Sequence, residues 1–153
     1  DRERTIRWLG PALMASAIED LSGFRWVSAG ADLMDSDVVG FRVMAGGVDG
    51  ILVSRRAEAS SVTASLVARR LAEGGAAAWV ARGGAPVVED GADPALAVGV
   101  ADLHWHILAR RPDEGEVRAL VELWVQVAAG GDHAAAWAAV MTVLLRDPEF
   151  LGY

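Results

Sequence analysis

The last third of the chain, from Asp93 to Tyr153, is divided into helices by clear start and stop signals. Asp93 can accept hydrogen bonds from the free N–H groups of a helix start, and Pro94 suits the first helical position. Pro112 ends that helix, because proline has no N–H to donate and its ring clashes with the preceding turn. The sequence therefore predicts a helix between the two prolines.

The helices that follow also begin at aspartates. Asp113 and Glu116 have the spacing of a capping box, with aspartate in place of the usual serine or threonine. Gly130 permits a stop, and Asp132 caps the next helix. The aspartate–proline signal recurs at residues 147–148. These signals predict a unit of three helices with a short terminal turn.

The first helix of this unit is apolar on two sides. One stripe consists of Leu96, Val100, Leu103 and Ile107, and the opposite stripe of Val98, Ala101, Trp105 and Leu108. A helix with two apolar sides is usually buried between neighbours. We therefore expect it to be the central helix of the unit.

The second helix has one apolar and one polar side. The apolar side holds Val117, Leu120, Val121, Trp124, Val127 and Ala128, and the polar side holds Arg118, Glu122 and Gln126. Trp124 and Trp137 each lie on the main apolar stripe of their helix. We expect both to be buried in one core with Leu103 or Ile107.

Signals in the first part of the chain are less regular. Pro11 and Gly23 bound a predicted helix. Residues 24–33 are compatible with a loop or a short extended piece. Residues 35–44 predict a short helix capped by aspartate, and residues 51–53 form an apolar run compatible with a short strand.

A long helix is predicted to begin after Ser60 or Ser61. Its apolar face consists of Ala64, Val67, Ala68, Leu71, Gly75 and Ala78. The Gly74-Gly75 pair either weakens this helix or allows a neighbour to come close.

These elements fit one mainly α domain over residues 1–153. It comprises an N-terminal part (1–84), a linker (85–92) and the C-terminal three-helix unit (93–153). We predict an irregular orthogonal bundle of about five or six helices, with one short strand near Ile51 as an option.

Composition excludes several kinds of chemistry. The chain has no cysteine, which removes thiol nucleophiles, thiolate metal sites and disulfides. All 14 basic residues are arginine, which removes Schiff-base lysines and the lysine of a P-loop. The net charge is −7, and from Ala85 onward four arginines face eleven acidic residues. An acidic chain without a basic tract is a poor candidate for binding nucleic acid.

Neither of two candidate metal sites fits. His104 and His106 are two residues apart, which places them about 200° apart around a helix, so one metal cannot bind both. Asp32, Asp35 and Asp37 fail to match a calcium loop, because the required oxygen ligands are missing at later positions. We predict no metal site, a structural or surface role for the histidines, and helix capping for the aspartates.

The best candidate for ligand binding is the glycine-rich loop at residues 46–50. Backbone N–H groups of such a loop can cradle an anion. Nearby arginines would add positive charge. The candidate site residues are Arg42, Gly46, Gly47, Asp49 and Arg55. A structural turn is the alternative, since the loop matches no phosphate-binding motif, and we identify no catalytic constellation in the chain.

Two segments resemble families of large secreted proteins of planctomycetes and myxobacteria. The stretch VVGFRVMAGGVDGILVSRR, from Val38, is similar to their motif Y/F-R-x-L-x-G-G-x-D-S/G. The segments ILARRPDEGEV and LLRDPEFL are similar to the start and end of their closing helical region, with Asp147 in place of the usual serine. The resemblance covers residues 38–56 and 93–153.

These families have no known function and are often fused to c-type cytochrome segments. The resemblance implies an extracytoplasmic location, periplasmic or secreted, and supplies no catalytic residues. The chain contains no haem-attachment motif, so a redox role would belong to another segment or chain. No cofactor is expected.

We therefore expect a non-catalytic structural or protein-interaction module of a larger extracytoplasmic protein or complex. The alternative is a ligand- or substrate-binding segment of a secreted enzyme that uses the loop at 46–50. The chain begins without methionine or a signal sequence, and we expect its partner to be another protein chain or the rest of a longer polypeptide. An exposed apolar patch lined by Trp8, Trp26 and Trp79 is predicted, unless all six tryptophans serve one internal core.

Overall fold

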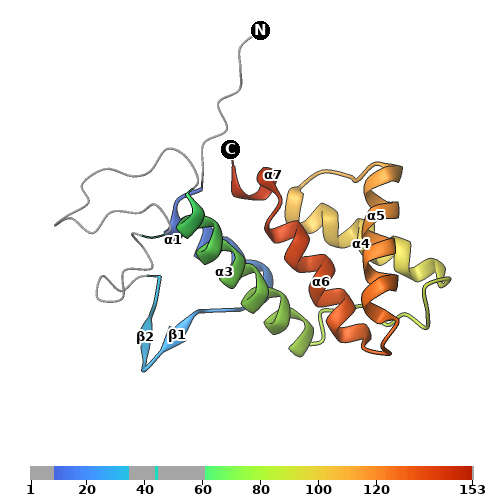
Figure 1. The fold of residues 1–153 in the computed structure, drawn as a ribbon, viewed down its shortest axis with the longest axis horizontal. Helices are drawn as coiled ribbons and strands as arrows, with labels where there is room; N and C mark the ends of the chain where they lie inside the picture. Colours follow the sequence, from blue (N-terminus) through green and yellow to red (C-terminus); the bar gives the residue numbers. More distant parts are fainter. Residues whose placement is uncertain (1–8, 35–43, 45–60, 153) are drawn as a thin grey trace, which may run out of the picture.

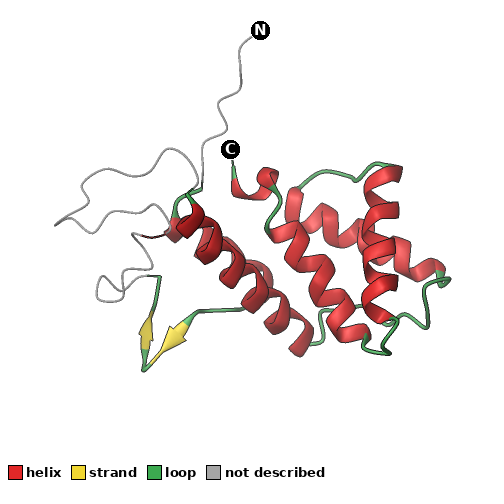
Figure 2. Cartoon of the chain, viewed as in Figure 1, coloured by secondary structure: helices red, strands yellow, loops and turns green. Residues whose placement is uncertain are grey.

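The structure is a computed structural model that describes residues 9–34, 44 and 61–152. Its helices are α1 (Pro11–Ser22), α3 (Val62–Ala81), α4 (Pro94–Leu108), α5 (Glu114–Ala128), α6 (His133–Leu145) and α7 (Pro148–Leu151), and its strands are β1 (Val27–Ser28) and β2 (Ala31–Asp32) (Figure 1). Within the described residues, the strands form only a small hairpin beside the helices (Figure 2). The predicted helical bundle is confirmed.

The hairpin falls in the stretch whose sequence is compatible with either loop or extended backbone. β1 and β2 are antiparallel, and Ala29 and Gly30 form the two-residue turn between the paired Ser28 and Ala31. Both turn residues have positive φ, 50° and 80°, as a type I′ turn requires. The strand predicted at residues 51–53 lies outside the described residues.

The predicted start signals are confirmed at α3 and at the four C-terminal helices. Ser61 accepts a hydrogen bond from the N–H of Ala64 at the start of α3. The aspartates that cap α4, α5, α6 and α7 are Asp93, Asp113, Asp132 and Asp147. Of the short helix predicted over residues 35–44, only Met44 is described.

The central helix is α6, which packs against α3 on one side and α5 on the other and also contacts α4 and α7 (Figure 1). The expectation that the helix beginning at Pro94 is central was wrong. Between His133 and Leu145 the chain contains no charged residue and five alanines. A helix without a charged face can be covered on several sides, and small side chains let its neighbours approach closely.

α4 buries only one of its two apolar stripes. Leu96, Val100, Leu103 and Ile107 face the core. On the opposite stripe Val98 is 60% exposed and Trp105 is 51% exposed. The two described N-terminal helices pack elsewhere, because α1 packs mainly against α3 and α3 packs mainly against α6.

The Gly74-Gly75 pair brings α1 and the segment after it close to α3. A Cβ atom on Gly75 would lie 2.6 Å from Cγ2 of Ile18, and one on Gly74 would lie 2.3 Å from Cζ of Phe24. Both distances are too short for real Cβ contacts. Of the two alternatives for these glycines, the structure shows close approach of a neighbour, and α3 continues through both.

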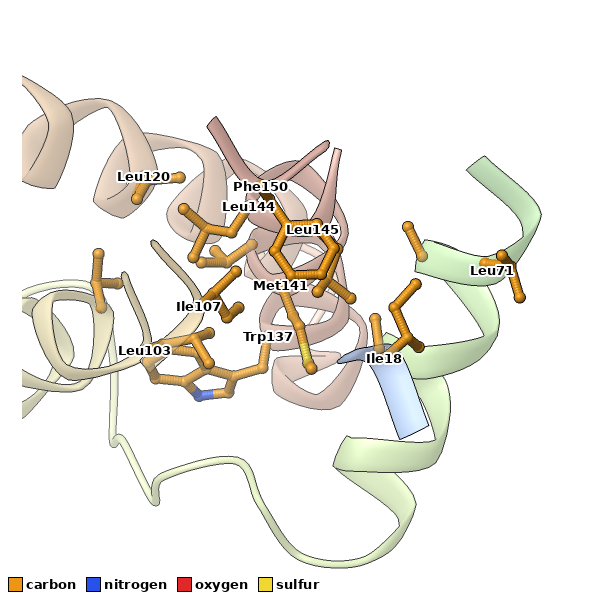
Figure 3. Close-up of a cluster of buried hydrophobic side chains, with 14 of the residues drawn as sticks. Ile18, Leu71, Leu103, Ile107, Leu120, Trp137, Met141, Leu144, Leu145 and Phe150 are labelled. Atoms are coloured by element: carbon orange, nitrogen blue, oxygen red, sulfur yellow. The ribbon is translucent and has the colours of Figure 1, made fainter. Parts of the chain in front are cut away.

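Trp124 and Trp137 are each 1% exposed and share one core with Leu103 and Ile107, as predicted. Figure 3 shows part of this core, with Leu103 and Ile107 of α4 lying near Trp137 and Met141 of α6. The Trp137 ring makes edge contacts with the rings of both Trp124 and Trp79. The core therefore runs without interruption from α3 to α5.

The tryptophans predicted to line an exposed patch do not do so where they are described. Trp26 and Trp79 are half-buried and pack against the core. Trp8 lies outside the described residues. Among the described residues, the exposed tryptophan is Trp105, which lies on the outer stripe of α4.

Candidate functional site

The predicted ligand-binding loop at residues 46–50 is outside the part of the chain that the structure describes. All its residues, namely Arg42, Gly46, Gly47, Asp49 and Arg55, lie outside the described residues. The loop and its arginines therefore stay a prediction.

The strongest polar assembly in the described chain surrounds Arg110, which follows α4. Its Nη1 and Nη2 atoms donate to the two carboxylate oxygens of Glu116 on α5, at 2.8 and 2.5 Å. Its Nε atom donates to Glu149 of α7 at 2.6 Å. We call Arg110, Glu116, Glu149 and the adjacent His104 the Arg110 cluster. It connects the end of α4 with the starts of α5 and α7.

Charges within the Arg110 cluster stabilise one another. The hydrogen bonds from Arg110, and then the one from the backbone N–H of Asp113, lower the pKa of Glu116 to about 2. The same contact with Glu116, followed by the contact with Glu149, raises the pKa of Arg110. Glu116 also completes the predicted capping box with Asp113. The carboxylate is thus fixed in its ionised form.

His104 is 2% exposed and supports this cluster from inside. Its Nδ1 atom lies 3.1 Å from the carbonyl oxygen of Arg110. Because a carbonyl oxygen only accepts, Nδ1 must carry the proton in this hydrogen bond. The Nε2 atom lies 3.8 Å from a Glu116 carboxylate oxygen, beyond hydrogen-bond distance. His104 thus holds the turn after α4, which agrees with the structural role predicted for it.

His106 lies on a different side of α4 and is exposed. Its Nδ1 atom is 2.8 Å from the carbonyl oxygen of Asp102, one helical turn earlier. The predicted angular separation of the two imidazoles is therefore confirmed. Among the described residues, no three histidine, aspartate or glutamate side chains are grouped so as to hold a metal ion. Asp32 accepts a hydrogen bond from Met34 N–H and pairs with Arg25.

One cavity of about 270 Å³ lies where α4 and α6 meet the ends of α1 and α3. Its apolar walls include Leu21, Trp79, Leu103, Ile107 and Met141. Asp102 and His106 of α4 supply polar lining. We call it the α4–α6 cavity.

A second hollow, of about 290 Å³, lies between the exposed side of α4 and the start of α5. It is lined by Ala101, Asp102, Trp105, Arg111, Pro112 and Val117. We call it the Trp105 groove. It continues the exposed stripe of α4 toward the turn that the Arg110 cluster holds.

Sequence reasoning missed both hollows and most of the Arg110 cluster. The Asp113–Glu116 spacing indicated that Glu116 would be held at a helix start, but it did not reveal Arg110 as a partner. Glu149 is 39 residues from Arg110, and no local pattern connects the two. The α4–α6 cavity likewise joins residues as distant as Leu21 and Met141.

Comparison of the chain with protein-family models, with curated proteins and with solved structures gave no match. The resemblance to secreted planctomycete and myxobacterial proteins therefore stays a prediction. In the described part of the chain, no helix is long and apolar enough to cross a membrane.

Proposed function

We propose that the chain is a non-catalytic protein-interaction module of a larger extracytoplasmic protein or complex. The observation that carries the proposal is the exposed stripe of α4. Val98 and Trp105 are seven residues apart, two helical turns, and therefore lie on the same side of the helix. A half-exposed tryptophan beside a groove with both apolar and polar lining is typical of a surface that another protein covers.

The composition of the Trp105 groove favours a protein as its partner. Ala101, Pro112 and Val117 provide apolar surface around the ring, while Asp102 and Arg111 supply one charge of each sign. Mixed charge around an apolar centre is the common arrangement of a protein–protein interface. A partner protein that inserts an apolar side chain beside Trp105 and places polar side chains around it would complement the groove.

The Arg110 cluster supports the same proposal by keeping this surface rigid. Arg110 fixes the turn that carries Arg111 and Pro112, and Glu116 fixes the start of the helix that carries Val117. A surface ordered before binding loses less conformational entropy when a partner docks. In this proposal the charged groups of the Arg110 cluster hold the binding surface in shape and do not themselves contact the partner.

Site-specific photo-crosslinking in the cells that produce the protein tests the proposal. A photoreactive phenylalanine analogue replaces Trp105 in one variant and Glu122, on the exposed polar side of α5, in a control. Position 105 should give a discrete cross-linked product identifiable by mass spectrometry, and position 122 should give much less. Equal products from both positions would count against an interface at α4.

The location is tested separately. The resemblance implies export, so cell fractionation with an antibody against the chain should find it outside the cytoplasm. Recovery in the cytoplasmic fraction would refute the extracytoplasmic part of the proposal and leave the interaction surface to the cross-linking result.

A further inference from the structure

We propose that the α4–α6 cavity binds a small organic amine, with the apolar body inside and the ammonium group at Asp102. This ligand site adjoins the protein interface proposed above, because Asp102 lines both the α4–α6 cavity and the Trp105 groove. The proposal rests on the apolar walls of the α4–α6 cavity together with two polar groups in its lining that accept hydrogen bonds.

The apolar walls of the cavity come from four different elements. Leu103 and Ile107 of α4 face Met141 of α6, as Figure 3 shows, and Trp79 of α3 and Leu21 of α1 complete the lining. Ligand sites are usually concave, mostly apolar hollows with a few polar groups that fix orientation. A volume of about 270 Å³ corresponds to about nine water molecules, which suits a ligand body of about nine or ten non-hydrogen atoms.

Polar groups of the cavity point to a ligand that donates hydrogen bonds. The Nδ1 atom of His106 is engaged with the carbonyl oxygen of Asp102, so it carries the proton. In the neutral imidazole Nε2 is then an acceptor. The Asp102 carboxylate is also an acceptor, and among the described residues it forms no ion pair. A positively charged donor would satisfy both groups.

Charge and aromatic lining favour a cation over a neutral donor. Residues 85–153 carry eleven acidic residues and four arginines, so their field attracts positive ligands. Trp79 adds an indole ring to the lining, and indole faces attract ammonium groups. An anion would meet the Asp102 carboxylate and be repelled.

Titration with three probes of nearly equal size tests this proposal. The probes are phenethylammonium, 2-phenylethanol and 3-phenylpropionate, and binding is followed through the indole N–H signals in ¹H–¹⁵N spectra, with Trp79 assigned from a Trp79→Phe variant. Phenethylammonium should bind saturably, with a Kd on the order of 0.1–1 mM for a ligand of this size. The alcohol should bind several-fold more weakly, and the carboxylate most weakly.

Two variants distinguish an effect of the Asp102 charge on ligand affinity from an effect of the net charge of the chain. Asp102→Asn should bring the affinity for phenethylammonium down to that for the alcohol, while the alcohol still binds. Glu122→Gln removes the same charge from the outer side of α5 and should leave the preference unchanged. Circular dichroism is the check that both variants fold. Equal binding of all three probes, no saturable shift of Trp79, or an equal loss in both variants would overturn the proposal.

Discussion

At the scale of single residues, Arg110 and Glu116 make the contact that does most to order the C-terminal unit. Isolated surface ion pairs contribute little, but a bidentate arginine–carboxylate pair within a network is the favourable exception. Glu116 has two roles, because it pairs with Arg110 and also accepts from the backbone N–H of Asp113. Its loss should therefore loosen both the turn after α4 and the start of α5.

Acid should weaken this contact in a defined pH window. Arg110 holds the pKa of Glu116 near 2 in the folded chain, below its ordinary value of 4.5. A carboxylate with a lowered folded-state pKa contributes stability that is fully present above its unfolded pKa. That contribution is lost as the pH falls from about 4.5 toward 2. Urea unfolding at pH 7, 4.5, 3 and 2.5 should show a falling free energy of unfolding.

The Glu116→Gln variant tests whether Glu116 causes this fall in the free energy of unfolding. The variant should lose about 1–3 kcal/mol at pH 7, because it gives up charged hydrogen bonds and half of a capping box. Its free energy of unfolding should then decline less steeply below pH 4.5 than that of the parent chain. Glu122→Gln, on the exposed side of α5, should stay within about 0.5 kcal/mol and keep the parent pH dependence. Parallel curves for the parent and Glu116→Gln would contradict the assignment.

At the scale of elements, helix starts could be predicted from sequence because capping is local, whereas α4 ends at Leu108, before the stop predicted at Pro112. Asp93, Asp113 and Asp132 accept hydrogen bonds from backbone N–H groups only two or three residues ahead. Which face of a helix becomes buried is decided by neighbours far away in the sequence. The two stripes of α4 are both apolar, so nothing local shows that the stripe with Trp105 stays exposed. The Arg110 cluster and the α4–α6 cavity were missed for the same reason.

The contact between α1 and α3 depends on Gly75. This residue has an ordinary helical backbone conformation, so glycine is needed there only for its lack of a side chain. Gly75 lies inside α3, where alanine would normally stabilise the helix by about 1 kcal/mol. Its new Cβ would meet Cγ2 of Ile18 at 2.6 Å, and overpacking of this kind typically costs about 1–3 kcal/mol. Gly75→Ala should therefore lower the free energy of unfolding in urea, despite the gain in helix propensity.

Gly130→Ala is the matched control for this substitution. A Cβ at Gly130 would meet no atom within 4 Å. That variant should be neutral or more stable by up to about 1 kcal/mol, because alanine restricts the unfolded chain. If Gly75→Ala were as stable as Gly130→Ala, the close approach of α1 to α3 would be disproved.

At the scale of the whole molecule, the tryptophans of the described helices divide into a row of three rings in or against the core and one exposed ring. Trp79, Trp137 and Trp124 follow one another by edge contacts from α3 through α6 to α5. Trp105 stands apart on the outer side of α4. Apolar residues serve stability when buried, so an exposed one contributes little to folding and remains available for binding.

Replacing Trp105 should therefore change the surface and leave the fold almost unaffected. Trp105→Ser should lower the free energy of unfolding by no more than about 1 kcal/mol, whereas Trp124→Ala in the core should cost about 3–5 kcal/mol. The parent chain should bind the dye 8-anilinonaphthalene-1-sulfonate at the Trp105 groove, and Trp105→Ser should reduce that fluorescence. Leu13, 56% exposed on α1, provides the control, because Leu13→Ser removes a similar apolar side chain elsewhere. An equal loss of dye fluorescence in both serine variants would show that α4 has no special apolar surface, and the interaction proposed for it would lose its support.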